Sequence, residues 1–383
     1  MSGNDNPKIK TRKLMILLLL IVAFIAITAA AIFLIFGSGS SWLTGLFSSR
    51  TPPITANEFN FDVGRERSFV HMEGSIAAAG TLGIQVLDAG GRETLRDSFR
   101  MSHPAIISSA GRSIAFDIGG SSIRVFNTGQ ITSSIEIEGT IVSASINRNG
   151  WFCVVTQEGG GLRGTASVYN NLGVVVFRVN LGSGFVLSAQ LSQDNKNLAV
   201  LNLTDTGSRI NFYHGIDEDK YPDQVFDFYG GLIIDIMYMS NGDILAVSTD
   251  SLFLVNRSAE GKTLYSFADN RLGGYSRYND FIALHLYDHG IGHRGRLVTL
   301  HSDGTILGET VTDREVISMS TADKALIVLK NDGLVLYNDS LEELIISTDN
   351  SYVAGAGRVL AVNRNVVLAT SDNSAVVIRF NAG

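Results

Sequence analysis

Two different hydrophobic patterns divide this chain. Residues 14–36 (LMILLLLIVAFIAITAAAIFLIF) form an apolar run that contains no charge, proline or glycine. From about Ile54 to the end, short apolar runs alternate with polar residues at a period of two, and no long window shows helical spacing. The pattern therefore predicts one helix followed by a large all-β domain.

The apolar run is long enough to cross a membrane. As a helix its 23 residues would be roughly 35 Å long, against a hydrocarbon core of about 30 Å. Four basic residues precede it, and residues 14–49 contain no charge. This asymmetry predicts a single-pass signal anchor in the cell membrane, with residues 1–13 in the cytoplasm and the rest outside. A cleaved signal peptide is the alternative, although its apolar core is usually only about 7–15 residues long.

Residues 37–53 (GSGSSWLTGLFSSRTPP) are rich in glycine and serine and end in two prolines, which is typical of a linker. The expected organisation is therefore a cytoplasmic tail (1–13), a transmembrane helix (14–36), a linker (37–53) and an extracytoplasmic β domain (54–383).

An internal repeat of about 42 residues runs through the β domain. Each unit contains an apolar strand, a second strand such as SIAAAG or NLAVLNL, a third strand such as IRVFN or ASVYN, and a turn into a fourth strand. The last apolar positions of the third strands are Leu87, Phe126, Tyr169, Tyr213, Val255, Leu300, Tyr337 and Ile378. Four short strands per repeat predict a β-propeller of about eight four-stranded blades, with seven as the alternative count.

The last repeat lacks its fourth strand. The segment Asn57–Val63 precedes the first complete unit, and we expect it to pair with the third strand of the final blade. That pairing would join the two ends of the ring and leave no open sheet edge there.

The repeated strands resemble those of quinoprotein-like and WD-type β-propellers. The layout as a whole resembles an uncharacterised family of membrane-anchored propellers from Gram-positive bacteria. The Trp-Asp dipeptide of the WD class is absent, and the only tryptophans, Trp42 and Trp151, cannot supply the repeated tryptophan motif of quinoprotein blades. The resemblance therefore implies the architecture, and we expect no cofactor.

Composition narrows the classes of partner and chemistry. The net charge of −7 disfavours a nucleic-acid-binding surface. The single cysteine, Cys153, excludes an internal disulfide, and its place in the apolar strand WFCVV predicts a buried, inert thiol. The 40 glycines against 5 prolines agree with many tight turns.

Three loops between second and third strands are longer than a tight turn: Gln157–Ala166, Asn202–Arg209 and Tyr287–Arg296. Because such loops share one face of a propeller with the connections between blades, we predict that this face binds the ligand. The candidate binding residues are Gln157, Arg163, Asp205, Arg209, Asp288, His289, His293 and Arg294.

The third of these loops also suggests a metal site. Imidazole and carboxylate groups bind zinc and other transition metals, and the candidate ligands are His285, Asp288, His289 and His293. Gly290, Gly292 and Gly295 indicate a hairpin loop rather than a helix, so the alternative is a set of solvated loop histidines.

No catalytic motif is evident in the sequence. We therefore expect a membrane-anchored binding or scaffolding propeller that contacts a protein or a cell-envelope polymer. Two alternatives stay open. One is a propeller enzyme, a glycosidase or lyase, acting on envelope polysaccharide. The other is a sensor that signals through a partner in the membrane.

Overall fold

Strands make up most of the part of the chain that the structure, a computed structural model, describes. The described residues are 54–157, 164–216, 221–268, 270–288, 294–347, 352–372 and 374–380. The predicted tail, membrane helix and linker lie outside them. Within the described ranges, no helix has the length and apolar character needed to span a membrane. Residues Thr55–Phe380 form one compact unit, which is described by itself.

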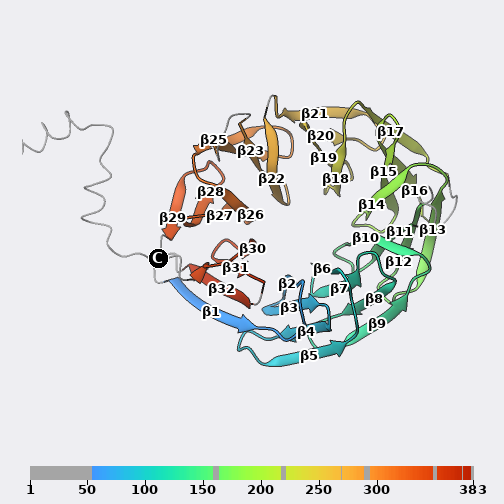
Figure 1. Ribbon diagram of the computed structural model, residues 1–383. Helices are drawn as coiled ribbons and strands as arrows, with labels where there is room; N and C mark the ends of the chain where they lie inside the picture. The colour runs from blue at the N-terminus through green and yellow to red at the C-terminus, as the bar shows by residue number, and fades with distance from the viewer. Residues whose placement is uncertain are drawn as a thin grey trace, which may run out of the picture. The chain divides into compact units, whose positions relative to one another are not determined.

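The strands form eight antiparallel sheets of four strands, arranged as the blades of a ring (Figure 1). Blades one and two contain β2 (Ser68–Met72), β3 (Ser75–Gly80), β4 (Gly83–Leu87) and β5 (Glu93–Ser98), then β6 (Pro104–Ser109), β7 (Arg112–Asp117), β8 (Ser122–Phe126) and β9 (Ile131–Glu136). Blades three and four contain β10 (Thr140–Ile146), β11 (Phe152–Gln157), β12 (Gly164–Tyr169) and β13 (Val175–Leu181), then β14 (Phe185–Leu191), β15 (Asn197–Thr204), β16 (Gly207–His214) and β17 (Gln224–Tyr229).

Blades five and six contain β18 (Ile233–Tyr238), β19 (Ile244–Ser248), β20 (Ser251–Val255) and β21 (Gly261–Ser266), then β22 (Arg271–Tyr278), β23 (Phe281–Tyr287), β24 (Gly295–His301) and β25 (Ile306–Thr312). Blades seven and eight contain β26 (Val316–Ala322), β27 (Ala325–Lys330), β28 (Gly333–Asn338) and β29 (Glu343–Ser347), then β30 (Arg358–Asn363), β31 (Val366–Thr370), β32 (Ser374–Phe380) and β1 (Ile54–Asn60). The first strand of each blade lies on the inside of the ring and the fourth on the outside (Figure 1).

The eighth blade joins the two ends of the ring. Its strand order is β30, β31, β32 and then β1, so the first strand of the domain pairs beside the last. The predicted closure is confirmed, with the strand spanning Ile54–Asn60 rather than Asn57–Val63.

The turns into the fourth strands follow the predicted chemistry. The Asn127 side-chain oxygen accepts a hydrogen bond of 2.9 Å from the backbone N–H of Gly129, two residues on. In the next blade, the Asn170 side-chain oxygen accepts a hydrogen bond of 3.0 Å from the backbone N–H of Leu172. Asparagine recurs there because its side chain holds the backbone in the turn.

The core is a series of apolar clusters, each between two neighbouring blades. Between blades four and five, for example, Leu201 of β15 packs with Ile244 and Phe253 of the next sheet. The innermost strands are also joined by serine side chains. The Ser143 hydroxyl donates a hydrogen bond of 2.9 Å to the Leu187 carbonyl of the next blade. The Ser318 hydroxyl oxygen accepts one of 3.1 Å from the backbone N–H of Val359, again in the next blade. Serine on these strands therefore links blades laterally.

The strand order defines two faces of the ring. We name the side with the second-to-third-strand loops and the blade-to-blade connections the loop face. The opposite side is the terminal face, because β1 begins and β32 ends there. On the terminal face, the turn of blade three meets that of blade six: the Arg148 guanidinium donates a 2.8 Å hydrogen bond to the Asn279 side-chain oxygen.

Candidate functional site

An irregularity recurs where the innermost strands begin on the loop face. In five consecutive blades, three to seven, the register of the first strand shifts by one residue near its start. The residue that the shift leaves unpaired is Val142, Leu187, Ile234, Gly273 or Ile317 in turn. A β-bulge re-aims one side chain out of the ladder, and bulges are common beside binding sites.

The bulge residues make the centre of the loop face apolar. Ile234 is 42% exposed and Ile317 43% exposed, and Phe185, which begins β14 at the same end, is 45% exposed. Val142 and Leu187 are half-buried. Blade six is the exception among the five, because its bulge residue, Gly273, has no side chain.

Two of the predicted loop residues share a cavity on this face. Asp205 and Arg209 line a space of about 490 Å³ at the loop-face end of blade four, together with Phe185. The predicted loop Asn202–Arg209 is shorter than expected, because Asn202 and Arg209 pair within β15 and β16 and only Asp205 and Thr206 form the turn. The guanidinium of Arg209 donates two hydrogen bonds to the Asp227 carboxylate, of 2.6 and 3.1 Å. This side-chain pairing holds the pKa of Asp227 below its usual value and fixes the direction of the Arg209 side chain.

The predicted residues of blade six separate into two environments. Asp288 and Arg294 lie at the base of the loop, where their charged groups are 3.6 Å apart. His285, by contrast, belongs to β23 and is only 1% exposed. The hairpin that the glycines predicted is present, since β23 pairs with β24.

The proposed metal ligands are therefore not assembled by the described part of the chain. Across the described ranges, no group of three His, Cys, Asp or Glu side chains is placed to hold a metal ion. His289 and His293 lie outside the described residues, as does Arg163, and the metal site stays a prediction. Gln157 is the last residue of β11, at the loop face.

His285 lines a cavity of about 210 Å³ between blades six and seven. The other lining residues lie on β22 and β26: Gly273, Gly274, Tyr275, Val316, Ile317, Ser318 and Met319. Among the described residues, none forms a hydrogen bond with the buried Nε2 atom of His285. Its ring packs edge-on against Tyr287, with the centroids 4.4 Å apart. Burial lowers the pKa of His285 to about 4, so the imidazole is neutral near pH 7.

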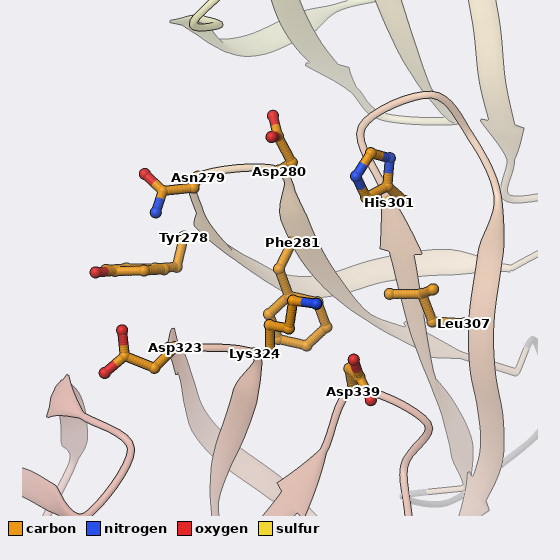
Figure 2. A pocket seen from close by; sticks show the side chains of 9 residues that line it. All are labelled: Tyr278, Asn279, Asp280, Phe281, His301, Leu307, Asp323, Lys324 and Asp339. Carbon is orange, nitrogen blue, oxygen red and sulfur yellow. The ribbon is translucent and has the colours of Figure 1, made fainter.

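The terminal face carries a cavity of a different character, of about 450 Å³ (Figure 2). Tyr278 ends β22 and Asn279 and Asp280 form the turn after it, while Asp323 and Lys324 form the corresponding turn of blade seven. Phe281, His301, Leu307 and Asp339 complete the lining (Figure 2).

Backbone geometry sets this second cavity apart. Asn279, Asp323 and Lys324 all have positive φ angles, of 53°, 48° and 61°. Such conformations are costly for residues other than glycine and are often kept at binding sites. The three carboxylates of the cavity, those of Asp280, Asp323 and Asp339, could accept hydrogen bonds from a hydroxyl-rich or amine-bearing ligand.

Sequence reasoning missed the apolar centre of the loop face and the cavity on the terminal face. The sequence does carry a signal for the apolar centre. At corresponding positions the inner strands of blades three to seven read IVS, VLS, IID, LGG and VIS. Except in blade six, two apolar residues follow one another there, which breaks the strict alternation of a strand. For the second, Asp323 and Lys324 occupy a tight turn without the glycine that such a turn favours.

Comparison with known families agrees with this architecture. The model of a family described as "Family of unknown function (DUF5711)" matches residues 54–377. The chain belongs to this family. No curated protein matches this DUF5711 chain. The membrane anchor that the resemblance implied lies outside the described residues and stays a prediction.

Solved structures similar to the DUF5711 chain share its fold at low identity. The C-terminal WD40 domain of Sif2 is 14% identical, with a TM-score of 0.59 over 85% of this chain and 99% of that one. The quinohemoprotein alcohol dehydrogenase ADHIIG from Pseudomonas putida HK5 is 11% identical, with a TM-score of 0.54 over 86% of this chain and 76% of that one. A eukaryotic initiation factor is 9% identical, with a TM-score of 0.57 over 83% of this chain and 86% of that one. The predicted likeness to WD-type and quinoprotein propellers is confirmed for the fold alone.

Proposed function

We propose that this chain is a non-catalytic binding module, held at the outer surface of a cell membrane by residues 14–36, and that its loop face binds a protein partner. The observation that carries the proposal is the apolar centre of that face. Ile234, Ile317 and Phe185 are each more than two-fifths exposed although they lie beside well-buried strands. Exposed apolar side chains gathered on one face are typical of protein-binding surfaces.

The course of the chain supports the same face. Because β1 begins on the terminal face, the chain that precedes β1 joins the domain at that face and leaves the loop face free of the attachment point. The bond between Arg148 and Asn279 crosses from blade three to blade six on the terminal side. This bond therefore lies in the path of a partner that approaches the ring axis from the terminal face.

A protein partner is favoured over an envelope polysaccharide by the chemistry of the centre. Polysaccharides need many hydrogen-bond donors and acceptors, whereas Ile234 and Ile317 offer neither. On the same face, Arg209 and the exposed aromatic ring of Phe185 add residue types that are enriched in protein interfaces.

The proposal is tested by capture on intact cells. Cells that express the full-length chain are treated with a cross-linker, and the amount of each cross-linked partner is measured for three forms of the chain. The double variant Phe185→Asp/Ile234→Asp places charge at the apolar centre, and we expect it to reduce capture by at least about tenfold. The control, Leu172→Asp, changes a 72% exposed apolar residue near the terminal face and should leave capture unchanged.

Two results would overturn the proposal. The first is equal capture by the double variant and the native chain, with unchanged unfolding temperatures. The second is a partner fraction made of polysaccharide, particularly if the native chain shortens it while Asp280→Asn does not. That result would assign the alternative function, an enzyme that uses the carboxylates of the terminal-face cavity.

A further inference from the structure

One kind of turn joins the third and fourth strands of blades one, three, five and seven on the terminal face. In each turn the side-chain oxygen of the first residue accepts hydrogen bonds from the backbone N–H groups of the third and fifth residues. In three of these blades the exposed third and fifth residues are glycine or polar: Gly90 and Arg92, Ser258 and Glu260, and Ser340 and Glu342. The turn itself therefore needs no apolar side chain at either position.

Blade three differs from the other three at both positions. Leu172 is 72% exposed and Val174 is 56% exposed, and Val175 and Val176, which begin β13, are exposed as well. We name these four residues the apolar lip. Apolar side chains that gather in one exposed place are in unfavourable contact with water, and they mark a surface that binds a protein or a lipid membrane.

The apolar lip is held in place by its neighbours. The Arg112 guanidinium of blade two donates a hydrogen bond of 2.7 Å to the Asn171 carbonyl. A Cβ atom at Gly173 would lie 2.5 Å from the Ser133 hydroxyl oxygen of β9, so the turn packs closely against blade two. Because these contacts fix the backbone of the turn, the lip does not have to be ordered when it binds.

The same side of the ring carries further residues that are typical of a lipid interface. Val176 also lines a groove of about 380 Å³ between blades three and four, together with Trp151 and Lys196. Tyr221 lies in the connection between the third and fourth strands of blade four and is 82% exposed. Tryptophan and tyrosine are enriched at the level of the lipid headgroups, because their rings are apolar and carry one polar group.

The chain that precedes the domain favours a lipid surface over a protein. It joins β1 on the terminal face, which is the face that carries the apolar lip. The apolar run 14–36 is separated from β1 only by residues 37–53, which at about 3.5 Å per residue reach at most about 60 Å. If the run crosses a bilayer, the lip meets lipid at a high effective concentration, and a few apolar side chains then suffice for contact.

We propose that the apolar lip inserts into the boundary between the headgroups and the acyl chains of a lipid bilayer. This inference rests on the proposed function, from which it takes the membrane location of residues 14–36. The lip lies on the terminal face and the proposed partner site on the loop face, so lipid and partner would not compete for one surface.

Quenching by brominated lipid chains tests the contact with the full-length chain reconstituted into liposomes. Trp42→Phe removes the tryptophan that precedes the domain, and Trp151 is left in place. A new tryptophan is introduced as Leu172→Trp or, for the matched control, as Ser258→Trp, the third residue of the same kind of turn in blade five. We expect the emission added by Leu172→Trp to be largely lost in brominated liposomes, and that added by Ser258→Trp to stay unchanged.

Val174→Glu provides the loss variant. Glutamate occupies this turn position in blades five and seven, as Glu260 and Glu342, so the turn should form as before. Added to Leu172→Trp, this charge should remove most of the quenching. Quenching of Leu172→Trp alone should persist at about 1 M salt, because salt screens attraction between charges but not apolar insertion. Its disappearance in salt would show that charge, and not the lip, brings the domain to the lipid.

Equal quenching at residues 172 and 258, or quenching of neither, would overturn the inference. If unquenched chains with Leu172→Cys form a disulfide with each other, the lip binds a second copy instead. The membrane anchor is tested separately by washing the liposomes at high pH, which removes proteins that do not span the bilayer. A chain that resists the wash without quenching keeps the anchor and rejects the lip. A chain that is quenched but removed by the wash keeps the lip and rejects the anchor.

Discussion

At the scale of single residues, Asp235 on the inner strand of blade five has a carboxylate whose charged form is destabilised by burial. Asp235 of β18 accepts hydrogen bonds from the Tyr275 hydroxyl and from the backbone N–H of Ile236, each 2.8 Å long. Burial nevertheless raises the pKa of Asp235 above its ordinary value, because desolvation outweighs these bonds. The Asp235–Tyr275 pair links blades five and six at the position where the neighbouring inner strands use serine.

The substitution Asp235→Asn should therefore stabilise the fold at neutral pH. A carboxyl whose pKa is raised by folding contributes stability that is complete below its unfolded pKa and is lost as the pH rises through its folded pKa. At pH 7.5 the native carboxylate carries this penalty and the amide does not. We expect the free energy of unfolding to rise by about 0.5–3 kcal/mol at pH 7.5, measured by denaturant titration.

The same comparison at low pH gives the control. Near pH 3.5, below the unfolded pKa of about 3.9, the advantage of the amide should disappear. The exposed residue Asp205, changed to Asn, should alter stability little at either pH. A loss of stability in Asp235→Asn at pH 7.5 would show that the charge itself is required in the bond to Tyr275.

At the scale of elements, the ring depends on the pairing of β1 with β32. Phe59 is the buried residue of β1 and packs in the cluster that joins blades eight and one, where Phe61 and Phe69 meet edge to face. A strand at the very start of the domain thereby completes a blade built from its end. Because β1 is the outermost strand of its sheet, β32 is its one strand partner among the described residues.

Phe59→Ala should open this closure. Removing a buried phenylalanine costs about 3–5 kcal/mol of unfolding free energy, and the loss should be accompanied by faster amide hydrogen exchange in β1 and β32. The adjacent residue Asn60 is exposed, so Asn60→Ala serves as the matched control and should change both little. Equal effects of the two variants would argue that β1 contributes no packing to the final blade.

At the scale of the whole molecule, the two faces and the single cysteine allow the predicted orientation to be tested directly. Cys153 is buried, and burial raises the pKa of its thiol to about 12, so the native chain offers no reactive thiol among its described residues. The sequence holds no other cysteine. A cysteine introduced on the loop face therefore reports that face alone.

We expect Thr206→Cys to react with a membrane-impermeant maleimide on intact cells, because the exposed residue lies on the loop face and that face is predicted to be outside. The native chain should remain unlabelled in the same experiment. Labelling of Thr206→Cys only after the cells are lysed would reverse the orientation and contradict an extracytoplasmic propeller.

The sequence by itself determined the four-stranded blade, a count of seven or eight blades and the pairing of the domain's first strand with its last repeat. These features depend on local chemistry and on counting: a repeat of about 42 residues, alternating strands, and asparagine turns such as Asn127, where donor and acceptor are two residues apart. The missing fourth strand of the last repeat pointed to β1 because an antiparallel ring leaves one place for it. The loop positions of Asp205 and Asp288 followed in the same way, whereas the predicted loop position of Arg209 was wrong because β15 and β16 extend until only Asp205 and Thr206 separate them.

Only the tertiary structure decided which side chains meet. Asp235 and Tyr275 are 40 residues apart, and Arg148 and Asn279 are 131 apart, so no local pattern relates them. The burial of His285 depends on β22 and β26, which belong to two different blades, and on a register shift at Gly273. Alternation predicts that a residue lies in a strand, but the pocket beside His285 exists because neighbouring blades pack at a distance that only the closed ring sets.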